Sequence, residues 1–367
     1  MEGMEPFYMA AVARCPGMGS VRLQDLVEFM GSAQAIWESR TGDWQVPGIG
    51  GKLKGQFEDF RKRNQELPQQ VQEECARLGI RLLTIREEDY PTMLKEIYDA
   101  PAVLYVKGTI KREVQRVAMV GARRFSPYGE AVAKSFGAGL AKAGVTVVSG
   151  GARGIDTASH QGALQVPGGR TVAVFGCGVD VAYPPENRRL FATIVERGGA
   201  LISEYVPGTQ PLPAYFPSRN RIIAGLSRGT VVVEAARRSG SLITAELALS
   251  EGREVFAVPG SIFSNTSEGC HHLLKEGAAM ASSVEDVLEG LGLAAEEKKP
   301  RQEPKLTPEQ RRVYQVLSFE HPLTIDEIIE CLPDEEVSAL SFVLLQMEME
   351  GLVVENELHA YRRAERE

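Results

Sequence analysis

The feature of this sequence that most limits its fold is a regular alternation, through the middle of the chain, of short apolar runs and amphipathic stretches. Helical patterns such as Gly129–Ala143 and Leu242–Glu251 separate the runs. The runs are Val117–Val120, Thr146–Ser149, Thr171–Phe175, Ala200–Ser203, Thr230–Val233 and Glu254–Val258. Strands that are apolar on both faces are typical of a parallel sheet covered by helices on both sides. We therefore expect an α/β fold with a Rossmann-like, doubly wound, mainly parallel sheet over residues 66–290.

The sequence before this region predicts a small helical domain at residues 1–65. Helical patterns at Arg22–Met30 and Lys52–Lys62 each follow a Pro-Gly-apolar-Gly turn, at 16–19 and 47–50. This arrangement is similar to a helix-hairpin-helix (SAM-like) domain, in which the backbone of a glycine turn can approach a phosphate. A tight turn within an ordinary helical bundle explains the same pattern.

The sequence after the sheet predicts a linker and then a third domain. Residues 291–306 are charged, contain proline and show no periodicity, so they are interpreted as a linker. In residues 307–367, Thr307 can cap a helix that runs through Phe319. Further helices are expected at Thr324–Cys331 and Asp334–Gly351, followed by a hairpin of Leu352–Val354 and Leu358–Tyr361. Three helices and a β-hairpin resemble a winged-helix domain.

The net charge of −8 argues against nucleic acid until the chain is divided. Residues 111–275 hold 19 Lys and Arg against 12 Asp and Glu, whereas residues 276–367 hold 9 against 21. A basic middle between acidic flanks can form a surface that attracts phosphate.

Composition also predicts the compartment. No run approaches the roughly 18 apolar residues that a membrane span requires, and the first residues carry Glu2 and Glu5 without a basic segment. The five cysteines are scattered and never form a C-x-x-C pair, which suits a reducing environment. We expect a cytoplasmic protein with no membrane association.

The turns that follow the predicted strands are rich in glycine, small hydroxyl residues and arginine. In a parallel sheet these turns meet at one edge, where ligands bind. They are Gly121–Arg124, Ser149–Asp156, Gly176–Asp180 and Ser239–Ala245, with Phe216–Ile223 before the fifth strand. Backbone N–H groups and guanidinium groups together can surround anionic oxygens. The sequence therefore predicts an anion site at this edge.

The known cofactor-binding and catalytic motifs considered for this sequence are incomplete or absent. The G-x-G that begins at Gly176 lacks its third glycine and a following helix, and there is no Walker A loop, so no cofactor is expected. No G-x-S-x-G elbow is present. The run from Cys270 to His272 places adjacent side chains in different directions on a helix, so no metal is expected. Asp156 could be a general base, but it is explained more simply as a helix N-cap.

These strand-end sequences together resemble the DNA-processing protein A (DprA/Smf) family. The resemblance runs from about Gly79 to Leu288 and rests on G-A-R, S-G-G-A-R-G-I-D, P-S-R-N-R-I-I-A-G-L and S-G-S-L-I-T-A. It implies a homodimeric protein that binds single-stranded DNA, protects incoming DNA and loads the RecA recombinase onto it during natural transformation, without enzymatic activity.

The resemblance also implies roles for individual residues. Arg123 would hold phosphate, and Phe216 would offer a ring on which a base stacks, unless it is ordinary core. The expected DNA-binding residues are Gly121, Arg123, Arg124, Ser149, Gly150, Gly151, Arg153, Phe216, Arg219, Asn220, Arg221, Ser239 and Ser241. His271, Leu274 and Met280 would form the dimer interface.

The sequence departs from the family pattern at two places. Pro185 stands where many relatives have lysine, which removes one expected phosphate contact. The recognition helix expected at 334–350 contains no Lys or Arg and several acidic residues. Groove recognition depends on phosphate contacts, so this domain is interpreted as a protein-interaction or spacer domain.

Two alternatives come from other functional classes. Ser227–Glu234 echoes part of the signature of nucleoside-monophosphate phosphoribohydrolases, which share a glycine-rich sheet edge, although the leading Pro-Gly-Gly is absent. A nucleotide-sensing module on a related Rossmann-like fold is the other alternative, and it would prefer mononucleotides to longer DNA.

Overall fold

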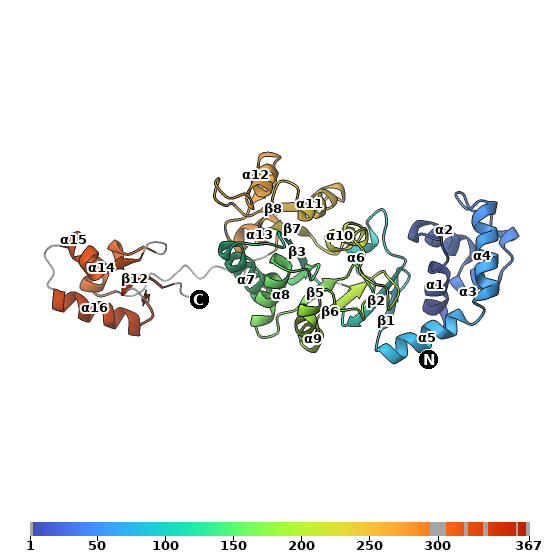
Figure 1. Cartoon of the computed structure of the whole chain (residues 1–367), viewed down its shortest axis with the longest axis horizontal. Helices are drawn as coiled ribbons and strands as arrows, with labels where there is room; N and C mark the ends of the chain where they lie inside the picture. Colours follow the sequence, from blue (N-terminus) through green and yellow to red (C-terminus); the bar gives the residue numbers. More distant parts are fainter. Residues whose placement is uncertain are drawn as a thin grey trace. The chain divides into compact units, whose positions relative to one another are not determined.

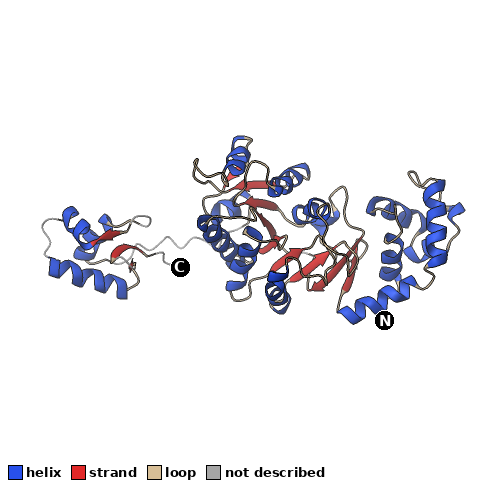
Figure 2. Ribbon diagram, viewed as in Figure 1, coloured by secondary structure: helices blue, strands red, loops and turns tan. Residues whose placement is uncertain are grey.

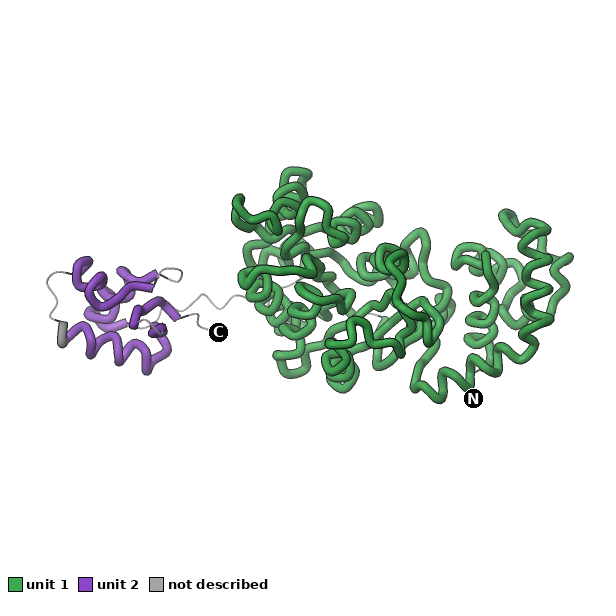
Figure 3. The backbone as a smooth tube through the Cα atoms, in the orientation of Figure 1, with its two compact units in different colours: residues 1–296 green, residues 297–367 purple. Residues whose placement is uncertain are grey.

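The computed structural model describes residues 3–112, 114–293, 306–318, 322–332, 337–356 and 359–364. The chain forms two compact units, residues 1–296 and 297–367 (Figure 3). Of the predicted linker, residues 294–305 lie outside the described residues. Phe319, Asp334 and Leu358, which bound predicted elements, also lie outside them.

Helices that pack around aromatic side chains begin the first unit. They are α1 (Glu5–Ala13), α2 (Ser20–Met30), α3 (Ala33–Glu38), η1 (Thr41–Asp43), α4 (Gly51–Arg63) and α5 (Leu67–Leu78) (Figure 1). The Phe57 ring lies 4.8 Å from the Trp44 ring and 5.9 Å from the Trp37 ring, and Trp44 and Phe57 are fully buried. Such ring contacts stabilise a small core beyond the area they bury. Both Pro-Gly turns directly precede a helix, α2 or α4, and Gly17 and Gly48 in them have positive φ.

The rest of the first unit is a nine-stranded sheet with helices on both faces (Figure 2). Its strands are β1 (Arg81–Thr84), β2 (Val103–Gly108), β3 (Arg116–Val120), β4 (Thr146–Ser149), β5 (Thr171–Val174), β6 (Ala200–Ser203), β7 (Gly229–Val232), β8 (Glu254–Ala257) and β9 (Ala279–Met280). They lie in the order β1-β2-β6-β5-β4-β3-β7-β8-β9. The pairs β1–β2 and β2–β6 are antiparallel, and the other pairs are parallel. The expectation of a mainly parallel, doubly wound sheet is confirmed.

Helices lie between these strands, and one more follows the last strand. They are α6 (Thr92–Lys95), α7 (Pro127–Lys142), α8 (Ile155–Gln165), η2 (Pro185–Asn187), α9 (Arg188–Glu196), α10 (Tyr215–Gly225), α11 (Gly240–Ser250), α12 (Glu268–Lys275) and α13 (Val284–Gly290).

Alternate residues of each central strand enter two different hydrophobic cores. Val117 and Met119 of β3 pack with residues of α7, α8 and α13. Ala118 and Val120 of the same strand belong to the core that α10, α11 and α12 cover. Because side chains alternate across a strand, burial on both faces requires the continuous apolar runs seen in the sequence.

The second unit is a small helical domain with a three-stranded antiparallel sheet, β10-β12-β11. Its elements are α14 (Pro308–Val316), β10 (Leu323–Thr324), α15 (Ile325–Cys331), α16 (Val337–Met349), β11 (Val353–Glu355) and β12 (Ala360–Arg363). Thr307 and Thr324 each cap the following helix in a reciprocal capping box, with Gln310 and Glu327 as partners. This arrangement agrees with the predicted winged helix.

Candidate nucleic-acid interface

The parallel part of the sheet has a point where the strand order reverses. From β3 the chain adds β4, β5 and β6 on one side, and it then returns to add β7, β8 and β9 on the other. In open α/β sheets, ligands bind outside the carboxyl ends of the strands at such a point. The loop after β3 begins at Gly121, and the loop after β7 contains Glu234, so these two loops flank the expected ligand site.

The buried side chain of Arg219, on α10, stabilises the loops after β4 and β5. Its residue is only 4% exposed, and its guanidinium donates to the backbone carbonyls of Gly150, at 2.8 Å, and Val174. These carbonyls end β5 and follow β4, so one buried side chain holds two loops. Burial lowers the pKa of Arg219 to about 10, and it still carries its charge at neutral pH. Arg219, predicted to bind DNA, is placed beneath the surface.

Asp156 is the buried carboxylate near Arg219. It was expected to be the N-cap of α8, but Gly154 occupies that position, and Asp156 lies in the first turn. Its carboxylate accepts from the backbone N–H groups of Gly150 and Ala152, both at 3.2 Å. Burial raises the pKa of Asp156, while the positive charge of Arg219 acts in the opposite direction. The buried Asp156 carboxylate therefore stabilises the conformation of the loop after β4 through these two hydrogen bonds.

Glu234, in the loop after β7, forms hydrogen bonds that connect this loop to the loops after β3 and β8. Its residue is 2% exposed, and its carboxylate accepts from the backbone N–H of Ser126 at 2.9 Å and from the hydroxyls of Ser126 and Thr266. These partners come from the loops after β3 and β8, so Glu234 joins three loops. A carboxylate with these partners is occupied in a structural role, which does not favour the phosphoribohydrolase alternative.

An exposed cation and two aromatic rings lie above these buried groups. The guanidinium carbon of Arg123 lies 5.5 Å from the centre of the Phe216 ring, and Arg123 is exposed. The Phe216 ring lies 5.6 Å from that of Tyr183, which is 37% exposed. Phe216 also packs on Gly176, where a Cβ atom would come within 2.9 Å of its ring. Rings beside an arginine provide the stacking and charge that single-stranded nucleic acid requires.

Three further arginines at this edge are exposed. Arg124 follows Arg123, and Arg237 and Arg238 lie between β7 and α11. Across the described residues, no carboxylate forms an ion pair with any of these three or with Arg123. The sequence interpretation missed Arg237 and Arg238, and it missed Tyr183. A search for arginines anywhere in the loop after a central strand finds Arg123, in the loop after β3, and also Arg237 and Arg238, in the loop after β7.

Two other predicted arginines have acidic partners. Arg221 pairs with Glu204 at 2.7 Å and with Asp99 at 3.1 Å, and only 15% of its side chain is exposed. Arg153 is exposed but forms an ion pair with Glu186. Neither presents a free positive charge, so phosphate would have to compete with a carboxylate at each.

The remaining predicted residues mostly form the framework of the edge. Ser149 is buried, and its hydroxyl donates to the Met119 carbonyl at 2.6 Å. Asn220 accepts from Arg219 and donates to Gly240, at 3.2 and 3.3 Å. Ser239 caps α11, and its hydroxyl lies 2.7 Å from that of Ser241. Gly121, Gly150 and Gly151 lie in the turns after β3 and β4.

The residues of the predicted dimer interface lie at the far end of the sheet. Met280 is 58% exposed in β9, which is the edge strand. Leu274 is half-buried against the core, and His271 lies 3.0 Å from the Gly260 carbonyl through its Nε2 atom. Cys270 is buried, whereas His272 is exposed beside Glu276. Within the described ranges, no group of three His, Cys, Asp or Glu side chains could hold a metal ion.

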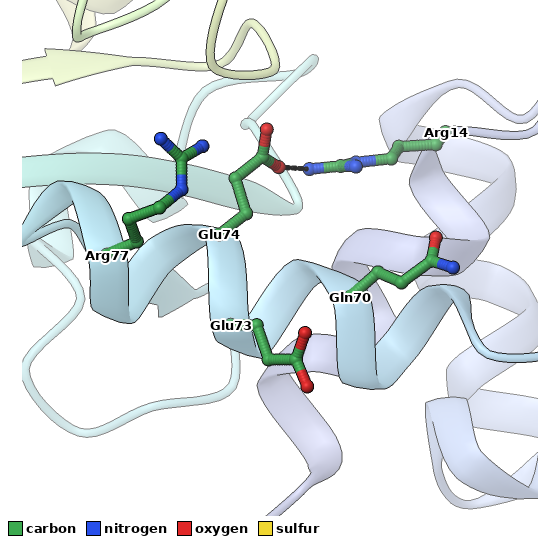
Figure 4. Close-up of a pocket in the computed structure, with 5 residues that line it drawn as sticks. All are labelled: Arg14, Gln70, Glu73, Glu74 and Arg77. Carbon is green, nitrogen blue, oxygen red and sulfur yellow. Dashed lines mark hydrogen bonds and ion pairs between the residues drawn. The ribbon is translucent and has the colours of Figure 1, made fainter.

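A hollow of about 370 Å³ lies elsewhere, on α1 and α5 (Figure 4). Its lining mixes both charges, and the Arg14–Glu74 ion pair at 2.8 Å partly neutralises it. The lining residues are Arg14, Gln70, Glu73, Glu74 and Arg77. It therefore lacks the excess positive charge of the strand ends. Among the helices described above, none combines the length and apolar composition that a membrane crossing requires.

Two family profiles match the sequence. The profile described as DNA recombination-mediator protein A matches residues 81–292, and the DprA winged helix domain matches residues 297–356. DNA processing protein DprA from Streptococcus pneumoniae is 50% identical over 206 residues, which cover 56% of this chain and 72% of the relative. Protein Smf from Escherichia coli is 47% identical over 211 residues, which cover 57% of this chain and 56% of the relative.

Solved structures agree with this similarity. The X-ray structure of DNA processing protein A from Streptococcus pneumoniae superimposes with a TM-score of 0.67 at 40% identity, covering 78% of this chain and 97% of that one. A structure of DNA processing protein A from Helicobacter pylori, which concerns its single-stranded DNA binding mode, has a TM-score of 0.52 at 28% identity. It covers 58% of this chain and 97% of that one.

Proposed function

The chain belongs to the DNA recombination-mediator protein A (DprA/Smf) family, and on that premise we propose that it binds single-stranded DNA along the carboxyl edge of its parallel sheet. The observation that carries this proposal is a group of four exposed arginines at the strand ends, Arg123, Arg124, Arg237 and Arg238, for which the described residues include no carboxylate partner. Arg123 lies beside the ring of Phe216, which in turn contacts the ring of Tyr183. We call these six residues the edge surface. Arginines would hold the phosphates, and the rings would stack on bases without reading their sequence.

The relatives support the same function. The similar Helicobacter pylori protein is one whose single-stranded DNA binding mode has been described structurally. The shape of the edge surface also favours a single strand. It is formed by loops at strand ends, whereas duplex readers insert a helix or a β-ribbon into the major groove.

The experiment that tests this proposal compares two matched pairs of cations. Arg237→Ala/Arg238→Ala removes half of the charge of the edge surface, whereas Lys62→Ala/Arg63→Ala removes two exposed cations at the end of α4. The first double variant should lower the affinity for a labelled single strand by about tenfold, and the second should change it little. Equal losses in both would show that binding depends only on net charge.

We further propose that the bound strand is passed to a RecA recombinase during DNA uptake in the cytoplasm, and that the protein acts by binding rather than by catalysis. The family description as a recombination mediator supports this role. Its test is RecA filament formation on single strands already covered by a single-strand-binding protein. This chain should accelerate it, and Arg123→Ala should not. If Arg123→Ala accelerated filament formation as much as the wild type, the edge surface would have no role in the transfer of DNA to RecA.

A homodimer is the proposed working state, with β9 and α12 as the contact. Met280 is exposed on the edge strand, and a two-fold axis that passes close to β9 would place the two copies of this residue near each other. Met280→Arg should therefore shift the protein toward monomer in light scattering while it remains folded. A dimer that persists unchanged would place the contact elsewhere.

A further inference from the structure

Helix α16 of the second unit is apolar on two sides. Its inner side chains, Leu340, Leu344 and Met347, are at most 1% exposed and form the core of this unit. Its outer side chains Phe342, Leu345 and Met349 are 61%, 55% and 83% exposed. Residues three, four and seven apart lie on one side of a helix, so these three form a single stripe, which we call the outer stripe.

Such a stripe is unusual on a surface helix. Surface helices normally pair one apolar face toward the core with a polar face toward water. Isolated exposed apolar residues need no explanation, but a contiguous group that includes a large aromatic ring marks an interaction site. The outer stripe adds nothing to the core, which the inner side chains already fill.

The stretch of sequence that contains the outer stripe is acidic. From Val313 to Tyr361 the sequence contains eleven Asp and Glu but no Lys or Arg. Glu348 on α16 and Glu330 on α15 are exposed. Glu350, just after α16, is also exposed, and its carboxylate accepts from the Gln310 side chain at 3.0 Å. The described arginines of this unit are confined to α14 and β12. This charge repels a phosphate backbone, although the position of α16 is where a winged helix would read DNA.

We propose that the outer stripe is a docking surface for a basic amphipathic segment of a partner protein. Apolar side chains of that segment would cover Phe342, Leu345 and Met349, and its Lys and Arg would face the surrounding carboxylates. Charge complementarity selects this partner, because a second copy of α16 would bring like charges together. The inference goes beyond DNA binding, which is proposed for the first unit.

The test uses the full chain and a labelled synthetic peptide with Leu on one helical face and Lys on the other. Two comparison peptides replace Leu by Ala or Lys by Glu. Phe342→Ser/Leu345→Ser/Met349→Ser removes the outer stripe, and Ile262→Ser/Phe263→Ser is the matched control, because these residues are 80% and 93% exposed on the first unit. Met349→Ser alone changes only the most exposed residue of the stripe. This single variant keeps the proposal testable if the triple variant does not fold.

The basic Leu–Lys peptide should bind the wild type and the control about equally, and about tenfold more weakly to the triple variant. Met349→Ser should show a smaller loss in the same direction, and both comparison peptides should bind weakly. Equal binding to wild type and triple variant would overturn the proposal, because it would mean adhesion by charge alone. The proposal would also be overturned if the wild type bound duplex DNA, or associated with itself, and the triple variant did not. DNA or a second copy of the chain would then be the partner of the outer stripe.

Discussion

Arginines at the carboxyl edge of the sheet differ in what their guanidinium groups contact. Arg219 is buried and donates to the carbonyls of Gly150 and Val174. Arg123 is exposed, and its main contact is the ring of Phe216. Substitution of the first should therefore change stability, and substitution of the second should change binding.

Arg123→Ala should weaken single-strand binding without altering the fold. Each phosphate contact that is lost lowers the slope of log affinity against log salt by roughly 0.7 for single strands. Anisotropy titrations over a range of salt concentrations measure this slope, and circular dichroism checks the fold. An unchanged slope and affinity would mean that Arg123 only packs on Phe216.

Arg219→Ala should destabilise the protein. The substitution removes two hydrogen bonds to buried carbonyls and leaves Asp156 buried without the nearby positive charge. Loss of one member of a buried charged pair costs about 3 to 5 kcal/mol. Denaturant unfolding gives the free-energy difference, and Arg123→Ala, at an exposed position on the same edge, is the control. A loss of DNA affinity with full stability would move Arg219 to the binding surface.

The sequence identified most arginines of this edge, although not Arg237 and Arg238, and it did not identify the partners of any. Arg221 pairs with Asp99 and Glu204, and Arg153 pairs with Glu186. These partners lie far away along the chain, and only the fold brings them together. The sequence therefore predicted most of the arginines that lie at this edge, but it did not predict which of them form ion pairs within the protein.

At the scale of elements, local rules predicted where strands and helices lie, usually to within a few residues. The apolar runs became β3 to β8, and Thr307, which was predicted to cap a helix, caps α14. The antiparallel attachment of β1 and β2 beside β6 was not predicted. Pairing between distant strands depends on the whole packing arrangement, and a local pattern does not contain it.

Helix α8 carries a buried histidine that should make stability depend on pH. The Nδ1 atom of His160 lies 2.6 Å from the Thr171 hydroxyl, which itself donates to the Val147 carbonyl, so Nδ1 carries the proton. Nε2 is buried and has no hydrogen-bond partner among the described residues. Burial lowers the pKa of His160 from 6.5 to about 3. The folded state therefore favours neutral His160.

Because the pKa is lower in the folded state, the contribution of His160 is complete above about pH 6.5 and is lost as the pH falls toward 3. Between pH 7.5 and 5 this loss amounts to about 2 kcal/mol. His160→Asn retains a donor toward Thr171 but does not titrate, so its free energy of unfolding should fall less over this range. His272→Asn, at an exposed position, is the control. Equal pH dependence of all three proteins would show that His160 does not titrate on unfolding.

At the scale of the whole molecule, charge is divided between the two units. The exposed arginines of the edge surface lie in the first unit, and the second unit is acidic with an apolar outer stripe. Removal of residues 297–367 should therefore leave single-strand affinity within about twofold, since the deleted part offers few phosphate contacts. A large loss of affinity in anisotropy titrations would place important DNA contacts in the second unit.

We propose that this protein prefers single-stranded DNA to duplex DNA and binds it at the carboxyl edge of the sheet. The most direct test is fluorescence anisotropy with single- and double-stranded oligonucleotides of equal length, at matched salt, for the wild type and Arg123→Ala/Arg124→Ala/Arg237→Ala/Arg238→Ala. We expect the wild type to bind the single strand at least about tenfold more tightly than the duplex, and the quadruple variant to lose most of this binding while it remains folded. Equal or tighter binding to the duplex, or full single-strand affinity in the quadruple variant, would contradict this proposal.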